Sequence, residues 1–309
     1  MDILTDLFSI FINSIAPILV IAGVGFLVGR LFSVDARSFG RVIFNAFSPA
    51  LVFYSLATTP VDREELVQLS VVMLLVLLTL LFLAYLSTWQ YHDNRVGRAG
   101  VLLSAICPNT GNLGLPLVSF VFGETALAYA VIAYILVTIL INSVGVFVAS
   151  SGHSSLGRAL RNILRVPAIY AAVAGLLINT TGITLPLPIA RSVSLLGQAA
   201  IPSMLILLGL ELARSMKLVH PRLIGLSVGL RLLVAPIVAA FLVTLLGVRW
   251  EVGRVIILQA SMPVAVVTLI VANEFKLNMQ QQVGTVLTTT LLSPLTLSVL
   301  ILLLQRGSG

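Results

Sequence analysis

Residues 106–116 read Ile-Cys-Pro-Asn-Thr-Gly-Asn-Leu-Gly-Leu-Pro and interrupt an apolar run that is otherwise long enough to cross a bilayer as a helix. Pro108 and Pro116 cannot donate a backbone hydrogen bond. Gly111 and Gly114 weaken the helix between them. In hydrocarbon the freed backbone groups need partners, so a broken helix is tolerated only inside protein or beside a water-filled cavity. Such a break at membrane depth is typical of the binding sites of transporters.

The same stretch carries three polar side chains, Asn109, Thr110 and Asn112. Amide and hydroxyl groups can satisfy the freed backbone groups, or they can bind a ligand. Taken alone, the stretch is equally consistent with a proline kink whose polar residues satisfy stray carbonyl groups. A second break much later in the chain favours a binding site. It consists of Gln259, Ala260, Ser261, Met262 and Pro263.

The composition restricts the class of protein. Of the 309 residues, 59% are hydrophobic and only 9% are charged, which excludes a soluble globular domain and indicates an all-α polytopic membrane protein. The formal net charge is +7, and in a membrane protein such an excess of lysine and arginine marks the cytoplasmic loops. The sequence has no basic cluster that would indicate a nucleic-acid partner. The single cysteine, Cys107, excludes an intrachain disulfide and a cysteine metal cluster. We therefore expect a lipid bilayer as the surroundings, with no cofactor, no metal and no nucleic acid.

Ten apolar segments are each near the ~20 residues that a helix needs to cross the hydrocarbon core. They are residues 8–29, 40–58, 66–89, 99–120, 125–149, 166–182, 190–213, 223–246, 253–273 and 280–304. The start of the chain, Met1–Asp6, is acidic where a signal peptide would be basic, so the first segment is expected to remain as a span. The connections are too short to hold a soluble domain.

Lysine and arginine indicate the orientation, because they concentrate on the cytoplasmic side. With the N-terminus outside, the inner loops hold twelve such residues: Arg30, Arg37, Arg41, Arg95, Arg98, Arg158, Arg161, Arg165, Arg214, Lys217, Arg222 and Lys276. The outer segments hold five: Arg63, Arg191, Arg249, Arg254 and Arg306. This bias predicts both termini outside and the loop of residues 150–165 inside.

Short patterns of the first half recur in the second half in the same order. The pairs are Pro17 and Gly25 with Pro167 and Gly175, Pro49 with Pro202, and residues 96–98 with residues 252–254. The offsets are 150, 153 and 156 residues. Residues 1–150 and 151–309 are therefore predicted to be two five-helix repeats. Since five is odd, the second repeat enters the membrane from the opposite side, as in many secondary transporters.

The two breaks lie in the fourth and ninth predicted spans, and if these spans cross at the midplane, four half-helix ends meet there. The half-helices that begin near Asn112 and Ala265 then present free N–H groups and positive dipole ends, which favour a carboxylate. The candidate substrate-binding residues are Asn109 as the main donor, Thr110, Asn112, Gln259, Ser261 and Asn142. Asn142 lies one turn from Thr138 on the fifth span, and helix–helix hydrogen bonding is an equally good explanation of that pair.

The motif Pro108-Asn109-Thr110, followed by Gly114-x-Pro116, resembles the Pro-Asn-Thr…Gly-x-Pro pattern of the auxin efflux carrier family, which includes the plant PIN carriers. The second half supports the resemblance with further short matches. These are residues 259–260, Pro263, residues 272–275 and residues 293–294. The similarity covers essentially the whole chain. The long central loop of the plant carriers is replaced by about sixteen residues, as in the bacterial members.

The resemblance implies a scaffold of spans 1, 2, 6 and 7 and a mobile transport domain of spans 3–5 and 8–10. It also implies a homodimer formed through the scaffold, an elevator movement, and small organic anions such as auxin, malate or malonate as substrates. Asn109 would contact the substrate carboxylate. A bacterial member would lie in the inner membrane. The related bile-acid symporter fold binds sodium through acidic and amide side chains, but both crossover stretches here lack Asp and Glu, so transport without sodium is expected.

Arg231 lies about nine residues into the eighth predicted span, where a charge is costly enough to suggest function. It could attract a substrate anion, or it could form a structural ion pair with Glu211 at the inner end of the seventh span. We favour the ion pair, because arginine reaches readily toward the interface.

A secondary carrier explains the repeat, the paired breaks and the absence of a soluble domain. An anion channel and a sodium-coupled symporter are the alternatives, since broken helices also line pores. An enzyme is not expected, because no His-Glu-x-x-His motif and no nucleotide-binding loop occur in the sequence.

Overall fold

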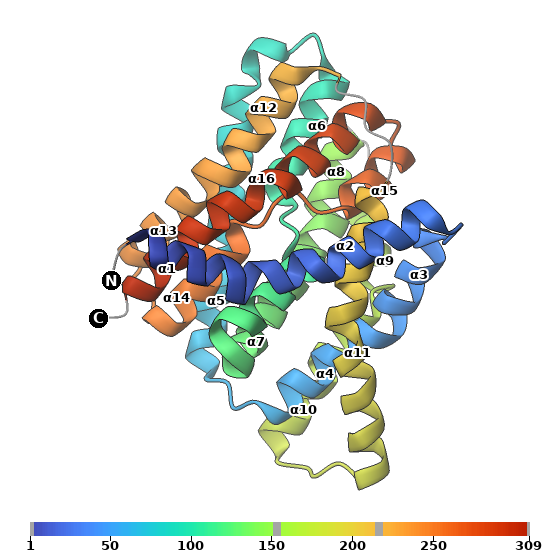
Figure 1. The fold of residues 1–309 in the computed structure, drawn as a ribbon, viewed down its shortest axis with the longest axis vertical. Coiled ribbons are helices and arrows are strands. Elements are labelled where there is room, and N and C mark those ends of the chain that lie inside the picture. Colours follow the sequence, from blue (N-terminus) through green and yellow to red (C-terminus); the bar gives the residue numbers. More distant parts are fainter. Residues whose placement is uncertain (1–2, 151–155, 214–218, 308–309) are drawn as a thin grey trace.

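The computed structural model describes residues 3–150, 156–213 and 219–307, and in this part of the chain every element is helical (Figure 1). Seven helical segments are long and apolar enough to cross a membrane. They are Thr5–Leu31, Ala36–Thr58, Arg63–Ser87, Thr110–Ala149, Leu187–Leu212, Pro221–Leu245 and Met279–Arg306. The prediction of an all-α polytopic membrane protein is confirmed.

The first half contains long helices interrupted by single π-helical turns. Its elements are α1 (Ile3–Ile10), η1 (Phe11–Ile15), α2 (Ala16–Leu31), α3 (Ala36–Val42), η2 (Ile43–Phe47), α4 (Ser48–Thr58), α5 (Arg63–Ser87), η3 (Trp89–Tyr91), α6 (Arg95–Ile106), η4 (Thr110–Gly114), α7 (Leu115–Leu140), η5 (Ile141–Gly145) and α8 (Val146–Ala149). Proline is the second residue of α2, α4 and α7, directly after the π turns η1, η2 and η4, where its missing N–H and its ring disturb the regular hydrogen bonds of the helix.

The second half has the same character. Its elements are α9 (Leu156–Ile163), α10 (Pro167–Thr181), α11 (Leu187–Leu212), α12 (Pro221–Gly229), η6 (Leu230–Val234), α13 (Ala235–Leu245), α14 (Trp250–Ala260), α15 (Val267–Glu274) and α16 (Met279–Arg306). Asn278 caps α16 by accepting a 3.0 Å hydrogen bond from the backbone N–H of Gln281.

The described residues contain seven long helices rather than ten, because the remaining predicted spans are short or broken. Gly123, at φ 80°, bends α7 sharply between the predicted ends at residues 120 and 125, so α7 contains the end of one predicted span and the start of the next. The ninth predicted span is divided into α14 and α15 by the break that begins at Ser261, and α10 has only 15 residues.

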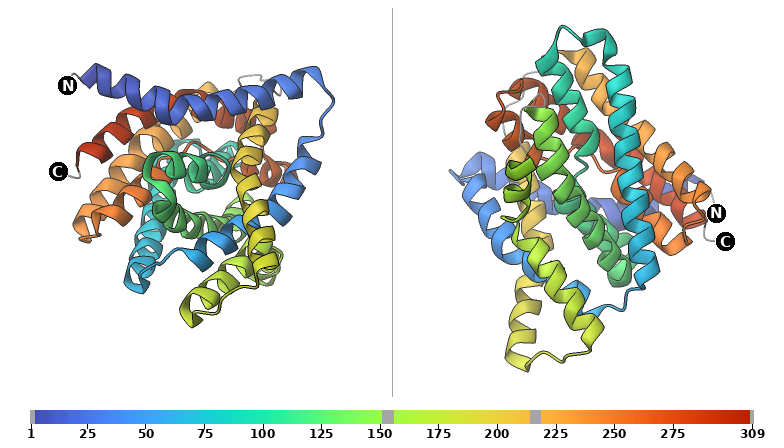
Figure 2. Two further views of the ribbon diagram at one scale, coloured as in Figure 1. Left: turned by 60° about the horizontal axis from the view of Figure 1, so that its bottom comes forward. Right: turned by 180° about the vertical axis from the view of Figure 1, so that it is seen from behind.

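Glycines allow two pairs of helices to approach closely. Helix α2 packs against α11, and α4 packs against α10, as Figures 1 and 2 show. A Cβ atom on Gly25 would lie 2.2 Å from the carbonyl oxygen of Ile206, and one on Gly175 would lie 2.9 Å from that of Phe53. Small residues at such crossings are the usual means of close helix packing in membranes.

These two glycine contacts join equivalent positions of the predicted repeats. Gly25 and Gly175 are 150 residues apart, as are the prolines that precede them. Phe53 and Ile206 are 153 residues apart, the same offset as the prolines of the second and seventh predicted spans. One contact therefore occurs twice, once in each direction between the repeats.

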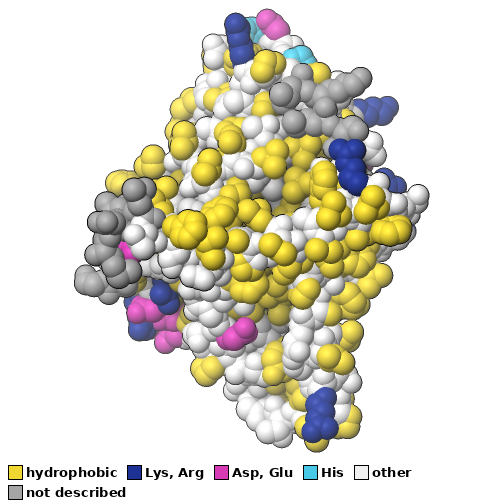
Figure 3. All heavy atoms as spheres, viewed as in Figure 1, with side chains coloured by type: hydrophobic (Ala, Val, Ile, Leu, Met, Phe, Trp, Pro, Cys, Tyr) yellow, Lys and Arg dark blue, Asp and Glu magenta, His cyan; other side chains and the backbone are white. Residues whose placement is uncertain are grey.

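The two ends of the described chain lie together. The start of α1 and the end of α16 lie beside each other (Figures 1 and 2), and Arg306 forms an ion pair with Asp6 at 2.5 Å. Figure 3 shows hydrophobic side chains spread across the middle of one face, with charged side chains mainly at its edges. Arg214, Lys217 and residues 151–155, which the predicted orientation uses, lie outside the described residues.

Substitution of Gly25 by alanine tests the close packing of α2 on α11. The new Cβ atom would meet backbone rather than a flexible side chain, so Gly25→Ala should lower the free energy of unfolding by about 1–3 kcal/mol. The measurement is thermal unfolding of the purified protein in detergent. Gly23→Ala on the same helix is the matched control, because nothing lies within 4 Å of a Cβ atom there. Equal loss of stability in both variants would contradict the proposed packing role.

Candidate functional site

The two breaks cross and hydrogen-bond to each other. The backbone N–H of Asn109 donates to the carbonyl oxygen of Pro263 at 2.8 Å, and that of Ala265 donates to Cys107 at 2.8 Å. Together they make an isolated antiparallel bridge. Cys107 and Pro263 are 156 residues apart, as are Asn109 and Ala265, so the two bonds also join equivalent positions of the predicted repeats. Each break thus satisfies backbone groups that the other has freed.

Arg231, in η6, supports the crossing from one side. Its guanidinium donates hydrogen bonds to the carbonyl oxygens of Ala105 at 3.1 Å, Ala260 at 2.5 Å and Met262 at 2.9 Å. The side chain is completely buried. The first two carbonyls belong to the last turns of α6 and α14, which carry the negative ends of the helix dipoles.

The predicted ion pair between Arg231 and Glu211 is therefore wrong. Carbonyl groups freed at the breaks have no helical donors, and a guanidinium with five N–H groups satisfies several of them at once. This holds Arg231 at depth instead of letting it reach toward the interface. Glu211 lines a cavity on α11 that Arg231 does not line, so the alternative of direct contact with a substrate in that cavity is not supported either.

Thr289 of α16 supports the second break. The backbone N–H of Val264 donates to its hydroxyl oxygen at 3.1 Å, and the hydroxyl donates to the carbonyl oxygen of Thr285 at 2.8 Å. Both threonines are buried. The backbone at the crossing is therefore held by α16 as well as by Arg231.

A cavity of about 750 Å³ lies beside the crossing. Part of its wall comes from α3, η2 and α11, and another part comes from η4, α7, η5 and α15. Six of the twelve candidate substrate-binding and crossover residues line it: Pro108, Asn109, Thr110, Gly111, Asn112 and Asn142. The lining does not include Gly114, Pro116, Gln259, Ser261, Met262 or Pro263.

Asn109 places an amide group in this wall. Its side-chain oxygen accepts a 3.2 Å hydrogen bond from the backbone N–H of Asn112 and so caps η4. Its Nδ2 is buried and has no hydrogen-bond partner among the described residues. A buried donor without a partner costs about 1–3 kcal/mol, so this group would gain a partner if a ligand acceptor reached it from the cavity.

Gln259 and Ser261 lie on the other side of the wall. Gln259 is completely buried against Gly114, where a Cβ atom would lie 2.2 Å from its Oε1. Ser261 donates its hydroxyl to the carbonyl oxygen of Ile257 at 2.6 Å. The structure thus separates the two residues from the cavity that Asn109 and its neighbours line.

Asn142 is in the cavity wall, but part of its hydrogen-bonding capacity is used. Its amide donates to the carbonyl oxygen of Thr138 at 2.8 Å. Thr138 in turn donates to the carbonyl oxygen of Tyr134 at 2.8 Å, and all three residues line the cavity. Asn142 therefore both forms a hydrogen bond within its own helix and lines the cavity.

The cavity also has charged residues that the sequence analysis used only for orientation. Arg37, Arg41 and Arg165 line it together with Glu211 and Glu274, so its charges have a positive balance. Arg37 and Arg41 stand four residues apart on α3, which places them on one helical face. The four-residue spacing was visible in the sequence and could have indicated that the two arginines face the same side of a helix.

Asp35 begins the helix that carries these arginines. It accepts hydrogen bonds from the backbone N–H groups of Arg37 at 3.0 Å and Ser38 at 3.3 Å. The Ser38 hydroxyl donates to the same carboxylate at 2.7 Å, and these bonds, led by that of the hydroxyl, hold the pKa of Asp35 below its ordinary value. The cap therefore stays charged at neutral pH and fixes the start of α3.

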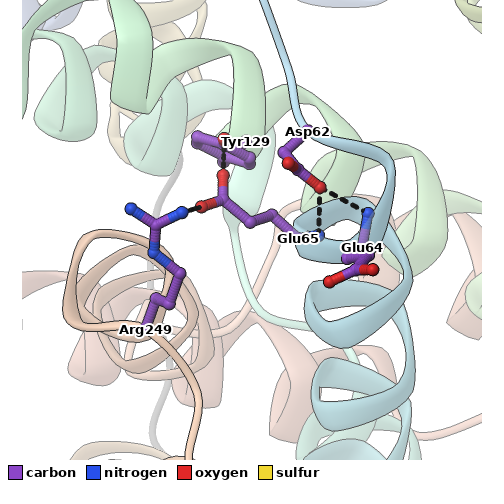
Figure 4. A network of polar contacts seen from close by, with 5 residues as sticks. All are labelled: Asp62, Glu64, Glu65, Tyr129 and Arg249. Atoms are coloured by element: carbon purple, nitrogen blue, oxygen red, sulfur yellow. Dashed lines mark hydrogen bonds and ion pairs between the residues drawn. The ribbon is translucent and has the colours of Figure 1, made fainter.

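A second polar cluster lies away from the cavity, at the start of α5 (Figure 4). Arg249 forms a 2.6 Å ion pair with Glu65, and Tyr129 of α7 donates a hydrogen bond to the same carboxylate. Asp62 caps α5 through the backbone N–H groups of Glu64 and Glu65. The sequence analysis did not identify this cluster, which connects α5, α7 and the start of α14.

Comparison with known proteins identifies the family of this chain. The profile of the family described as "Membrane transport protein" matches residues 10–155 and 151–301. A transporter of Methanothermobacter thermautotrophicus is 27% identical over 286 residues, which cover 91% of this chain and 94% of that protein. The "Putative malonate transporter" of Rhizobium meliloti is 28% identical over 302 residues, with 92% of both chains covered.

The chain is also similar to a plant protein. The "Probable auxin efflux carrier component 3b" of Oryza sativa is 29% identical over 124 residues, which cover 38% of this chain and 21% of that protein. The family and these relatives are transporters rather than enzymes. The chain belongs to the membrane transport protein family and counts plant auxin efflux carriers among its relatives.

Proposed function

We propose that this protein is a secondary carrier of small organic anions and that it binds a substrate carboxylate at the crossing, in the cavity that Asn109 lines. The carrying observation is the buried Nδ2 of Asn109, which has no partner among the described residues and belongs to a residue of the cavity wall. The first turns of η4 and α15 stand at the same wall, and helix N-termini favour an anion.

The size and charge of the cavity support a small anion. Its volume of about 750 Å³ is within the usual range for small-molecule sites. Arg37, Arg41 and Arg165 would raise the local concentration of anions at the mouth without binding them tightly at depth. The printed name of the Rhizobium relative mentions malonate, which makes malonate a suitable first probe.

The architecture we propose has ten spans in two inverted repeats, residues 1–150 and 151–309. Two observations support it: the equivalent hydrogen bonds at the crossing and the equivalent contacts of Gly25 and Gly175. The ion pair that joins α1 and α16 is consistent with an even number of crossings. We assign α1–α4, α10 and α11 to the scaffold and the remaining spans to a mobile transport domain.

The cavity lies between these two units, as an elevator movement requires. We propose that the transport domain carries the substrate past the scaffold, and that two copies associate through their scaffolds. The three cavity arginines belong to predicted inner loops, so the cavity would open toward the cytoplasm, which suits efflux. Both termini would lie on the outer side of a bacterial inner membrane.

The substitution Asn109→Ala tests the binding site. Loss of one hydrogen bond to a charged group costs roughly 1.5–3 kcal/mol, so the dissociation constant for malonate should rise by about one to two decades. Isothermal titration of purified protein measures this. Asn45→Ala is the matched control, because Asn45 also lines the cavity but its amide already donates to the carbonyl oxygen of Arg41 at 2.7 Å. Unchanged affinity in Asn109→Ala, or an equal loss in both variants, would exclude the proposed role.

Single-cysteine labelling tests the orientation. In a Cys107→Ala background, Thr184→Cys should react with an impermeant maleimide on intact cells, whereas Arg161→Cys should react only after permeabilisation. Both positions are exposed, one between α10 and α11 and the other on α9. The expectation follows from the twelve-to-five distribution of lysine and arginine. The reverse labelling pattern would require the opposite orientation.

A further inference from the structure

We infer that the carbonyl oxygens around Arg231 form a cation site in the crossing, and that the guanidinium of Arg231 fills it permanently in place of a coupling cation. The cation site itself stands on the contacts of Arg231 alone. Its consequence for coupling rests on the proposed carrier function.

The atoms around the guanidinium are oxygens of the kind that bind cations. Its three oxygens are the carbonyls of Ala105, Ala260 and Met262, which lie 2.5–3.1 Å from guanidinium nitrogens. Two of them end half-helices and the third lies in the break itself. Carbonyl groups of unwound backbone and half-helix C-termini are the groups with which broken-helix transporters coordinate sodium ions or protons.

The Arg231 side chain is surrounded by carbonyl oxygens, as a bound cation would be, and does not reach the surface as most arginines do. Arg231 is completely buried, and its hydrogen-bond acceptors among the described residues are these three carbonyls, with no carboxylate. A charge at this depth is costly unless it has compensating dipoles, and two helix C-termini supply them. The positive charge of Arg231 is therefore compensated by carbonyl dipoles of the crossing and not by an acidic side chain.

The position of the site explains how such an ion would serve transport. Met262 directly precedes Pro263, whose carbonyl accepts from the backbone of Asn109. The cation thus stabilises the break without lining the cavity, and the bridge connects it to the residue that we place on the substrate. Because this cation is covalently part of η6, it moves with the transport domain and needs no ion from solution.

Arg231→Ala tests the inference by emptying the site. In choline chloride we expect its apparent Tm to fall by roughly 10 °C, because loss of the guanidinium leaves three buried carbonyl groups without this donor. Guanidinium chloride at about 10 mM should restore at least half of the fall, since a ligand that binds only the folded state stabilises it. At this concentration its denaturing effect is negligible. The wild-type Tm should not depend on whether sodium, potassium or choline is the cation.

Arg254→Ala is the matched control. Arg254 also lies in this bundle, on α14, but its guanidinium stands over the ring of Phe122 at 4.6 Å rather than on carbonyl groups. Guanidinium should not stabilise this variant. An unchanged Tm in Arg231→Ala, no response of that variant to guanidinium, or a specific stabilisation of the wild type by sodium would each overturn the inference.

Two further variants decide the matter if Arg231→Ala cannot be purified. Arg231→Lys keeps the charge, whereas Arg231→Gln keeps hydrogen-bond donors without the charge. We expect the lysine variant to be recovered folded and the glutamine variant to be clearly less stable. Equal stability of the two would show that donors suffice and would overturn a cation site.

Transport gives a readout that a merely structural arginine would not change. In proteoliposomes, malonate uptake by the wild type should be the same in sodium, potassium and choline, whereas uptake by Arg231→Ala should require guanidinium or a small metal cation. Cation-independent uptake by Arg231→Ala would contradict the inference. If the wild type fails to bind malonate, the proposed substrate is wrong, while the stability measurements still decide whether the crossing holds a cation.

Discussion

Two helices that break within hydrocarbon leave peptide groups that lipid cannot satisfy, and each such group is costly without a partner. Here each break supplies partners for the other, through the bonds from Asn109 to Pro263 and from Ala265 to Cys107. This bridge fixes the point where four half-helix ends meet, and the cavity lies directly against it. The polar wall of the cavity therefore follows from the same pairing that permits broken helices in the membrane.

The crossing has two sides of opposite polarity. On one side the carbonyl ends of α6 and α14 meet the guanidinium of Arg231. On the other side the N-terminal turns of η4 and α15 face the cavity. An anion in the cavity and the cation behind the bridge would therefore each meet the helix ends that favour them. Gln259 and Ser261 are polar like the wall residues but do not line the cavity, and Gln259 is buried against Gly114 instead.

Sequence reasoning located the breaks and the polar residues of the wall, because proline and glycine have direct consequences for backbone hydrogen bonds. It failed for Arg231, since an expected carboxylate partner was easier to see than three backbone carbonyls contributed by two other segments. It also did not bring Arg37 and Arg41 to the cavity, although their four-residue spacing was visible. Tertiary packing decides which helices face each other. The periodicity of a single helix predicts its buried face but not the helix that packs against it.

A carrier must release what it binds, and the wall is composed accordingly. The residue at depth is a neutral amide beside helix N-termini, each of which favours an anion moderately. The fixed positive charges that line the cavity belong to Arg37 and Arg41 of the short helix α3 and to Arg165, just before α10. Arg231, which is completely buried, is held by carbonyl groups and does not line the cavity. A guanidinium in direct contact with a desolvated carboxylate would bind it far more strongly and slow its release, so a neutral donor at depth suits repeated cycles of binding and release.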